Sequence, residues 1–408
     1  MNILIYTFFI LTYLLIASRR LSLLPIGRPA GALLGAVLMV TVGALTPKES
    51  YAAIDYDTIV LLFGTMVLTV YLELAGFFEW LASHVLLLAK TPRGLLLATS
   101  LLSGLLSALL VNDTVCLFLT PVIMSACTRA NLPMGPYLIA LATSANIGSS
   151  ATLVGNPQNM IIGSFSGFPF TQFLLYAGPA AAVGLFLNMG LLLLYYGRRL
   201  PKELPENLPV VWSGDRKRLR IVLIVTGVVI IGFFAGFHLG YTALSGVIAL
   251  ILIENKDPRN VFSRVDWSLL LFFCCLFIVV AGLTKTGIIE RSWKASTPYL
   301  AISEPTGLFM FSALMTFGSN LVSNVPMVLI TGPHLNELGS AQFGWVLLAY
   351  TTTVAGNFTL LGSVANIIVA ERAKDHYTLG FFEYLRFGMV STLVVLIAGV
   401  AVIYLIMT

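Results

Sequence analysis

Long apolar runs alternate with short polar segments along the whole chain. The runs reach about 20 residues, the length that an α-helix needs to cross roughly 30 Å of hydrocarbon. They are continuous rather than alternating residue by residue, which excludes a β-barrel. We therefore predict an all-α polytopic membrane protein with about ten transmembrane helices. The predicted spans are 2–18, 29–46, 57–77, 134–165, 171–197, 220–237, 240–254, 266–286, 342–371 and 380–407.

Two further apolar segments, 94–129 and 305–333, carry polar residues near their middle. We predict that each is a re-entrant hairpin, which enters and leaves the membrane on the same side. The segments at about 78–90 and 287–295 are expected to lie along the membrane surface.

Two of the predicted spans are interrupted by polar, glycine-containing tracts. These tracts are "SANIGSSATLVGNPQN", from Ser144, and "TTTVAGNFTLLGSVAN", from Thr351. Non-helical backbone at membrane depth persists only where protein or a watery cavity satisfies its N–H and C=O groups. We therefore predict that 134–165 and 342–371 are broken helices that line such a cavity.

The two halves of the chain resemble each other. Asp55 aligns with Asp266 at an offset of 211 residues, Asn112 with Asn324 at 212, and Asn159 with Asn366 at 207. Five spans and one hairpin separate equivalent points, so the repeats are expected to have opposite orientations. Inverted repeats with broken helices place a substrate site between the halves. The predicted units are an extra N-terminal span at 1–27, repeat 1 at 28–197, a basic linker at 198–219 and repeat 2 at 220–408.

Composition and charge agree with a membrane protein. Hydrophobic residues make up 58% of the chain and charged residues 10%, whereas soluble proteins contain about 25% charged residues. If the N-terminus is outside, 18 of the 23 Lys and Arg residues, among them Arg19 and Arg20, fall in cytoplasmic segments. This bias predicts a multi-pass protein of the cytoplasmic (inner) membrane with both termini outside. Basic cytoplasmic loops also explain the net charge of +5, so the charge need not indicate binding of nucleic acid. The first apolar run is predicted to be a retained span.

Four polar elements, namely two hairpin tips and two helix breaks, are expected to converge. Free backbone groups and neutral side chains there suit a small ligand. The predicted substrate-binding residues are Asn112, Asn146, Ser149, Ser150, Asn324 and Asn357. A second tier comprises Thr114, Thr152, Asn156, Asn159, Ser323, Thr353, Thr359 and Asn366. Any one of these residues alone could instead cap a helix or bond across helices.

Asp113 is the only acid in the four elements, and its repeat partner is Val325. A lone carboxylate inside a membrane is costly and by default functional, so we predict that Asp113 takes up and releases a proton. The alternative is a carboxylate held permanently by amides or a sodium ion. No Lys, Arg or His lies in the four elements, which favours a small neutral polyhydroxy solute. Cys116 follows Asp113 by one helical turn, but no three-cysteine cluster is apparent, so a metal site is not expected.

The hairpin tips and helix breaks resemble those of the ion transporter superfamily. "LVNDTVCLFLTPVI" and "SATLVGNPQNMIIG" are most similar to ArsB-type arsenite and antimonite efflux permeases. This resemblance implies ten spans, two hairpins and export of trivalent arsenic or antimony as neutral hydroxides, driven by inward proton flow. It also implies that Asn112, Asp113 and Asn324 line the site. Some members work with a soluble ATPase partner. Sodium-coupled dicarboxylate carriers have Ser-Asn-Thr at both tips, a pattern that this chain lacks.

Our interpretation is a secondary active transporter, an arsenite/antimonite–proton antiporter that works by alternating access and has no cofactor. The alternatives are a sodium/proton antiporter or a sodium-coupled anion symporter on the same scaffold. The chain has no G-x-x-x-x-G-K-[ST] loop, so a pump would need an ATPase partner. An enzyme is not expected, because no acid–base pair, nucleophile–histidine set or metal-ligand cluster appears among the spans.

Overall fold

The computed structural model describes residues 2–17, 27–205, 212 and 214–408, and every regular element in these ranges is a helix. The prediction of an all-α fold is confirmed. Arg19 and Arg20, as well as 206–211 of the predicted linker, lie outside the described residues.

The helices before the predicted linker end with a 27-residue helix, α10. They are α1 (Asn2–Ala17), α2 (Arg28–Thr41), α3 (Pro47–Ala52), α4 (Tyr56–Leu74), α5 (Phe77–Leu88), α6 (Pro92–Leu109), α7 (Asn112–Arg129), α8 (Met134–Ser149), α9 (Pro157–Ser166) and α10 (Phe170–Tyr196). The later elements are α11 (Arg216–Phe234), α12 (Leu239–Glu254), α13 (Arg259–Phe262), α14 (Trp267–Thr284), α15 (Ile288–Ser296), the 3₁₀-helix η1 (Thr297–Tyr299), α16 (Pro305–Val322), α17 (Asn324–Thr331), the 3₁₀-helix η2 (Gly332–Leu338), α18 (Ala341–Ala355), α19 (Val364–Ala373) and α20 (Phe381–Met407).

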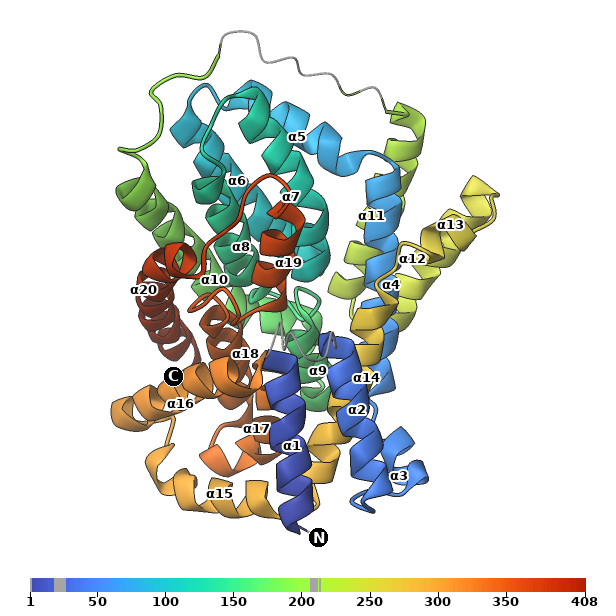
Figure 1. Cartoon of the computed structure of the whole chain (residues 1–408), viewed down its shortest axis with the longest axis vertical. Coiled ribbons are helices and arrows are strands. Elements are labelled where there is room, and N and C mark those ends of the chain that lie inside the picture. The colour runs from blue at the N-terminus through green and yellow to red at the C-terminus, as the bar shows by residue number, and fades with distance from the viewer. Residues whose placement is uncertain (1, 18–26, 206–211, 213) are drawn as a thin grey trace.

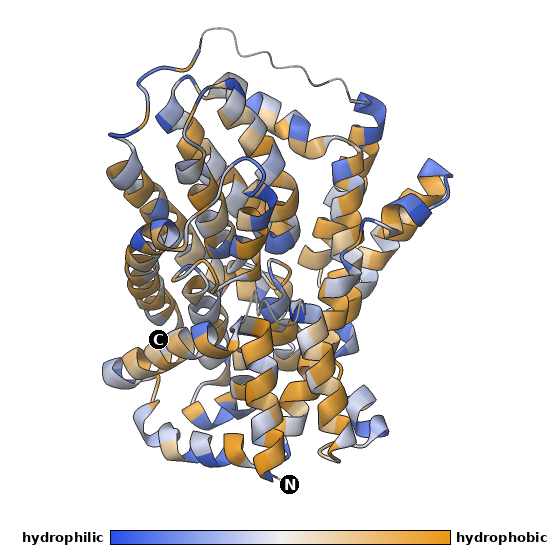
Figure 2. Cartoon of the chain, in the orientation of Figure 1, coloured by the Kyte–Doolittle hydropathy of each residue, from blue (hydrophilic) through white to orange (hydrophobic). Residues whose placement is uncertain are grey.

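Five of these helices are long and apolar enough to cross a membrane. Four of them, α4, α10, α14 and α20, coincide with predicted spans, and the fifth, α6, is the first arm of a predicted hairpin. Helices α1, α2 and α12 are apolar but shorter. Hydrophobic residues cover the flanks of the molecule, while hydrophilic residues gather at its two ends and near its centre (Figure 2). This distribution fits a polytopic membrane protein.

The helices are interrupted within the polar tracts and at the hairpin tips. Leu110 and Val111 separate α6 from α7, and Ser323, with a positive φ of 74°, separates α16 from α17. The segment 150–156 separates α8 from α9, and 356–363 separates α18 from α19. Asn and Gly in these tracts favour turns over helix, so each tract leaves backbone groups free at the helix ends.

The helix pairs of the two predicted hairpins lie in opposite halves of the molecule. The pair α6 and α7 lies in the upper half of Figure 1, and the pair α16 and α17 lies in the lower half. Each second arm packs against the broken helix of the other repeat, α7 against α19 and α17 against α9. This exchange brings both hairpin tips to the breaks between α8 and α9 and between α18 and α19.

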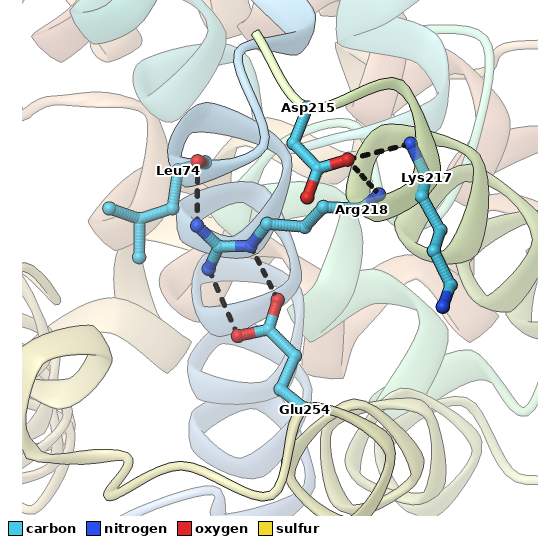
Figure 3. Close-up of polar contacts among 5 residues, drawn as sticks. All are labelled: Leu74, Asp215, Lys217, Arg218 and Glu254. Atoms are coloured by element: carbon cyan, nitrogen blue, oxygen red, sulfur yellow. Dashed lines mark hydrogen bonds and ion pairs between the residues drawn. The ribbon is translucent and has the colours of Figure 1, made fainter.

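A largely buried ion pair joins the ends of three helices, α4, α11 and α12. Arg218 at the start of α11 donates from Nε and Nη2 to both carboxylate oxygens of Glu254 at 2.6 and 3.0 Å, and from Nη1 to the carbonyl oxygen of Leu74 at 2.9 Å (Figure 3). Asp215 caps α11 by accepting from the amide nitrogens of Lys217 and Arg218. The ends of α4, α11 and α12 are therefore held together by one guanidinium group.

Candidate functional site

The Asn146 side chain, on α8, lies at the centre of a buried amide network. Its Nδ2 donates to Asn357 Oδ1 at 2.8 Å and to Asn366 Oδ1 at 2.9 Å. Its Oδ1 accepts from Asn112 Nδ2 at 3.0 Å and from Ser363 Oγ at 3.0 Å. A side-chain amide has two N–H donors and two acceptor lone pairs, so Asn146 uses its whole hydrogen-bonding capacity. It links the first hairpin tip to the break of the other repeat.

The helix breaks use the same hydrogen bonds in both repeats. Asn159 Nδ2 donates to the carbonyl oxygens of Ser149 and Thr152 at 3.2 and 2.8 Å. Its repeat partner, Asn366, donates to those of Gly356 and Thr359 at 2.8 and 3.1 Å. These acceptors lie ten and seven residues before each asparagine. An asparagine side chain thus satisfies the free carbonyls that each helix break creates.

A second set of contacts crosses between the repeats. Asn156 Nδ2 donates to Thr353 Oγ1 at 3.3 Å, and Gln158 Nε2 donates to the same oxygen at 3.1 Å. Asn156 also donates to Ser149 Oγ at 3.0 Å and caps α9 by accepting from the Asn159 amide. At an offset of 207 residues, the Asn156–Thr353 contact corresponds to the Ser363–Asn146 contact. These two equivalent contacts join the broken helices in a nearly symmetric way.

The second hairpin tip is less fully bonded than the first. Asn324 Oδ1 and Asn320 Oδ1 are buried acceptors with no hydrogen-bond partner among the described residues, whereas the unpartnered hydroxyl of Ser319 has an equivalent in the first hairpin, Ser107. Both asparagines face the break between α18 and α19, because a Cβ at Gly362 would lie 2.7 Å from Asn320 Oδ1 and one at Gly356 would lie 3.3 Å from Asn324 Nδ2. Asn159 Oδ1 likewise has no partner in the described ranges. A buried acceptor without a donor is costly, and a ligand carrying O–H groups would satisfy it.

Asp113 is 4% exposed and follows Asn112, but its side chain lies outside the amide network. Its backbone amide donates to Asn112 Oδ1 at 2.8 Å. Its side chain lines a cavity of about 20 Å³ with Thr114, Met66 and Asp266. Successive helical residues point about 100° apart, which is why Asn112 faces the network while Asp113 faces α4 and α14.

The remaining predicted residues have more local contacts. Ser150 Oγ donates to the carbonyl oxygen of Ile147 in its own helix, and Ser149 Oγ donates to that of Asn146. Thr152 Oγ1 donates to the Ala108 carbonyl oxygen and so joins the first break to its hairpin. Thr359 contributes its carbonyl oxygen to Asn366, and Ser323 supplies the backbone turn of the second hairpin.

The sequence reasoning missed three residues of this site. Ser363 and Gln158 take part in the contacts between the repeats, and Asn320 donates to the Ala355 carbonyl oxygen at 2.9 Å. Ser363 is the repeat partner of Asn156, so the 207-residue offset could have found it. Gln158 and Asn320 have no comparable signal, because single polar residues in apolar segments usually only bond within their own helices.

The site is chemically neutral apart from Asp113. The side chains that form the network are amides and hydroxyls, and no Lys, Arg or His is among them. In the part of the chain that the structure describes, no three His, Cys, Asp or Glu side chains gather as metal ligands would. Such a site can bind hydroxyl-bearing solutes through amide and carbonyl groups, whereas it offers an anion no charged partner.

Comparisons with known proteins identify the family. Residues 13–355 match the family described as CitMHS, citrate transporter. The chain is 33% identical over 498 residues to the putative transporter arsB of Dictyostelium discoideum, covering 94% of this chain and 88% of that protein. It is 35% identical over 450 residues to the silicon efflux transporter LSI3 of Oryza sativa subsp. japonica, covering 93% of both.

A solved structure supports the fold alone. The crystal structure of the Alcanivorax borkumensis YdaH transporter, described as having an unusual topology, is similar with a TM-score of 0.53 and 15% identity. The similarity covers 99% of this chain and 97% of that one. The family match extends over most of the chain, and the two relatives above exceed 30% identity along nearly all of it. This protein is therefore a membrane transporter that belongs to the CitMHS citrate transporter family, within the ion transporter superfamily.

Proposed function

We propose that this transporter exports small neutral metalloid hydroxides, arsenite and antimonite in the form As(OH)₃ and Sb(OH)₃, in exchange for protons. The observation that carries the proposal is the buried, uncharged amide network between the repeats, with the acceptors Asn159 Oδ1, Asn320 Oδ1 and Asn324 Oδ1 lacking donors among the described residues. A neutral hydroxide brings O–H donors to such acceptors and needs no charged partner.

The relatives' names support the same class of solute. One is called a silicon efflux transporter and another a putative transporter arsB. Dissolved silicon at neutral pH is the uncharged hydroxide Si(OH)₄, which has the same chemistry as As(OH)₃. We therefore include silicic acid among the candidate substrates.

The family description suggests citrate as a different substrate. Citrate carries up to three negative charges, and burying them without paired cations is expensive. The side chains of the network offer amides and hydroxyls only, and the nearest acid, Asp113, would repel the anion. We therefore place citrate second to a neutral hydroxide.

Proton coupling is assigned to Asp113. Its backbone amide donates a hydrogen bond to Asn112 Oδ1, and Asn112 Nδ2 in turn donates to Asn146 Oδ1. A change of charge on Asp113 would therefore alter the position of the first hairpin tip against the network. If solute binding and protonation of Asp113 each weaken the other, linkage between the two equilibria produces exchange of solute for protons.

Transport requires the contacts between the repeats to open. Asn146 bonds directly to Asn357 and Asn366, so the network is closed in this conformation. Solute hydroxyls would replace these bonds while the repeats move to expose the site on alternate sides. The hairpins would be re-entrant, and both termini would face the outside of the cytoplasmic membrane. Secondary transport requires no ATPase, and the basic linker is the segment on which a soluble ATPase partner could dock.

Uptake into everted membrane vesicles tests the proposal. Arsenite should accumulate only when the vesicle lumen is acidic, and a sodium gradient should have no effect. Asp113→Asn should abolish accumulation. Uptake that ignores the pH gradient would reject proton coupling, sodium-driven proton movement without arsenite would favour a sodium/proton antiporter, and sodium-driven citrate uptake would favour the anion symporter.

A further inference from the structure

The two repeats differ in charge beside the aspartates that cap α4 and α14. In repeat 1, Asp55 caps α4, and its Oδ2 accepts from Ser164 Oγ at 2.7 Å. In repeat 2, Asp266 caps α14 in the same way, accepting from the Leu269 amide at 3.0 Å. The residue that replaces Ser164 at the 207-residue offset is Glu371. The capping aspartate of repeat 1 therefore has a hydroxyl beside it, whereas the equivalent position in repeat 2 carries a second carboxylate.

This charged corner lies next to Asp113. Asp266 lines the small cavity that contains Asp113, together with Leu269 and Ile368. The same three residues also line an open cavity of about 310 Å³, whose other lining residues include Arg28 and Glu371. Asp266 thus lies between a small cavity, large enough for one water molecule, and a wider one of about 310 Å³.

The geometry points to a one-sided proton pathway, in which Asp266 relays protons between Asp113 and the open cavity and Glu371 stands at its mouth. This inference rests on the proposed function, because it assumes that Asp113 carries the coupled proton. The equivalent path would run from Val325 in repeat 2 to Asp55 and Ser164 in repeat 1, and it lacks carboxyl groups at the positions of Asp113 and Glu371. With the proposed orientation, α14 begins at the cytoplasmic side, so the pathway releases protons to the cytoplasm.

The charged surroundings suit a relay. Arg264 also lines the small cavity, and its Nη1 donates to Glu73 at 2.8 Å, so its charge is balanced by another acid. Asp266 lines the small cavity together with Asp113, Arg28 lines the open cavity together with Asp266, and Cys116 lies one turn further along α7. The proton step is simple: the Asp113 carboxyl O–H gives its proton to water in the small cavity, and that water gives a proton to the Asp266 carboxylate. Asp266 then releases it to solvent in the open cavity.

Time-resolved infrared spectroscopy after a pH jump tests the pathway without any metalloid. The infrared band that is absent in Asp113→Asn is assigned to the protonated carboxyl group of Asp113. Asp266→Asn should slow the appearance of this band by at least about tenfold, because a proton relay is lost. Glu371→Ser, which copies repeat 1, should slow it in the same direction. Asn caps helices as well as Asp does, so Asp266→Asn should keep the fold.

The matched control is Asp55→Asn, which changes the equivalent cap in repeat 1 and should leave the rate within about twofold. An unchanged rate in Asp266→Asn, equal slowing in Asp55→Asn, or the absence of any Asp113 band would overturn the pathway. Failure of the proposed function gives a different result from failure of the pathway. Arsenite uptake would then be independent of the pH gradient, while the infrared kinetics would still depend on Asp266.

Discussion

At the scale of single residues, two equivalent asparagines differ by one hydrogen bond. Asn159 and Asn366 make the same pair of bonds to the carbonyls of their helix breaks, but only Asn366 also accepts from Asn146. Asn366→Ala should therefore destabilise the protein by about 1–2 kcal/mol more than Asn159→Ala. Thermal unfolding in detergent measures the difference. Equal losses would show that the bond between the repeats contributes nothing.

For Asn324 we predict that substitution by alanine does not reduce stability. Its Oδ1 is a buried acceptor that lacks a partner in the described part of the chain, so removing it relieves a cost rather than creating one. Asn324→Ala should keep or raise the melting temperature while it strongly reduces arsenite transport. Ser312→Ala, in the same helical hairpin, is the control and should leave transport unchanged, because the Ser312 hydroxyl donates to the Leu308 carbonyl oxygen of its own helix. A transport-competent Asn324→Ala variant would exclude this residue from the solute site.

A pH-dependent contact joins Glu49, in the short helix α3, to Lys285 at the end of α14. The pKa of Glu49 is lowered to about 2, mainly by its hydrogen bond to Lys285 and also by its bonds to Thr46. Since the pKa is lower in the folded state, this contact stabilises the protein above the usual carboxyl pKa and is lost as the pH falls from about 4.5 towards 2. Glu49→Gln should lower the melting temperature slightly at pH 6 and make no difference near pH 2. A constant difference across this range would contradict the assignment.

At the scale of helices, one guanidinium joins α4, α11 and α12. Arg218→Lys removes the two-pronged contact with Glu254 and the bond to the Leu74 carbonyl (Figure 3). Because the pair is largely buried, we expect a loss of about 1–3 kcal/mol in unfolding free energy. Lys217→Ala is the control, because its side chain extends away from the pair (Figure 3) and only its backbone amide is bonded. Equal stability of the two variants would show that the contact is not structural.

The helices and their breaks follow from the sequence more closely than the side-chain directions do. Each predicted polar tract contains a break, because Asn, Gly and Pro at these positions favour helix ends and turns. The expected convergence of hairpin tips and helix breaks places Asn112, Asn146 and Asn357 in one group, and these three side chains are hydrogen-bonded to each other through Asn146. It does not separate Asp113 from this group, since a difference of one residue in helical register decides which wall a side chain faces. Nor does it show that Ser150 bonds within its own helix, because serine can do either.

At the scale of the whole molecule, the repeats are proposed to insert in opposite directions. The bases of the two hairpins should then face opposite sides of the membrane. In a cysteine-free background, a cysteine placed at Lys90 should react with a membrane-impermeant reagent only from the cytoplasm, and one at Ser303 only from outside. Labelling of both positions from the same side would contradict inverted insertion and with it the shared site.

The central claim is that the neutral amide network between the repeats binds an uncharged hydroxide. Equilibrium dialysis of the purified transporter with arsenite, followed by elemental analysis of bound arsenic, tests it most directly. We expect saturable binding that silicic acid competes for, that is unchanged by sodium or citrate, and that Asn324→Ala abolishes in a folded protein. Arsenite binding that is undetectable, or that survives Asn324→Ala and is displaced by citrate, would contradict the claim.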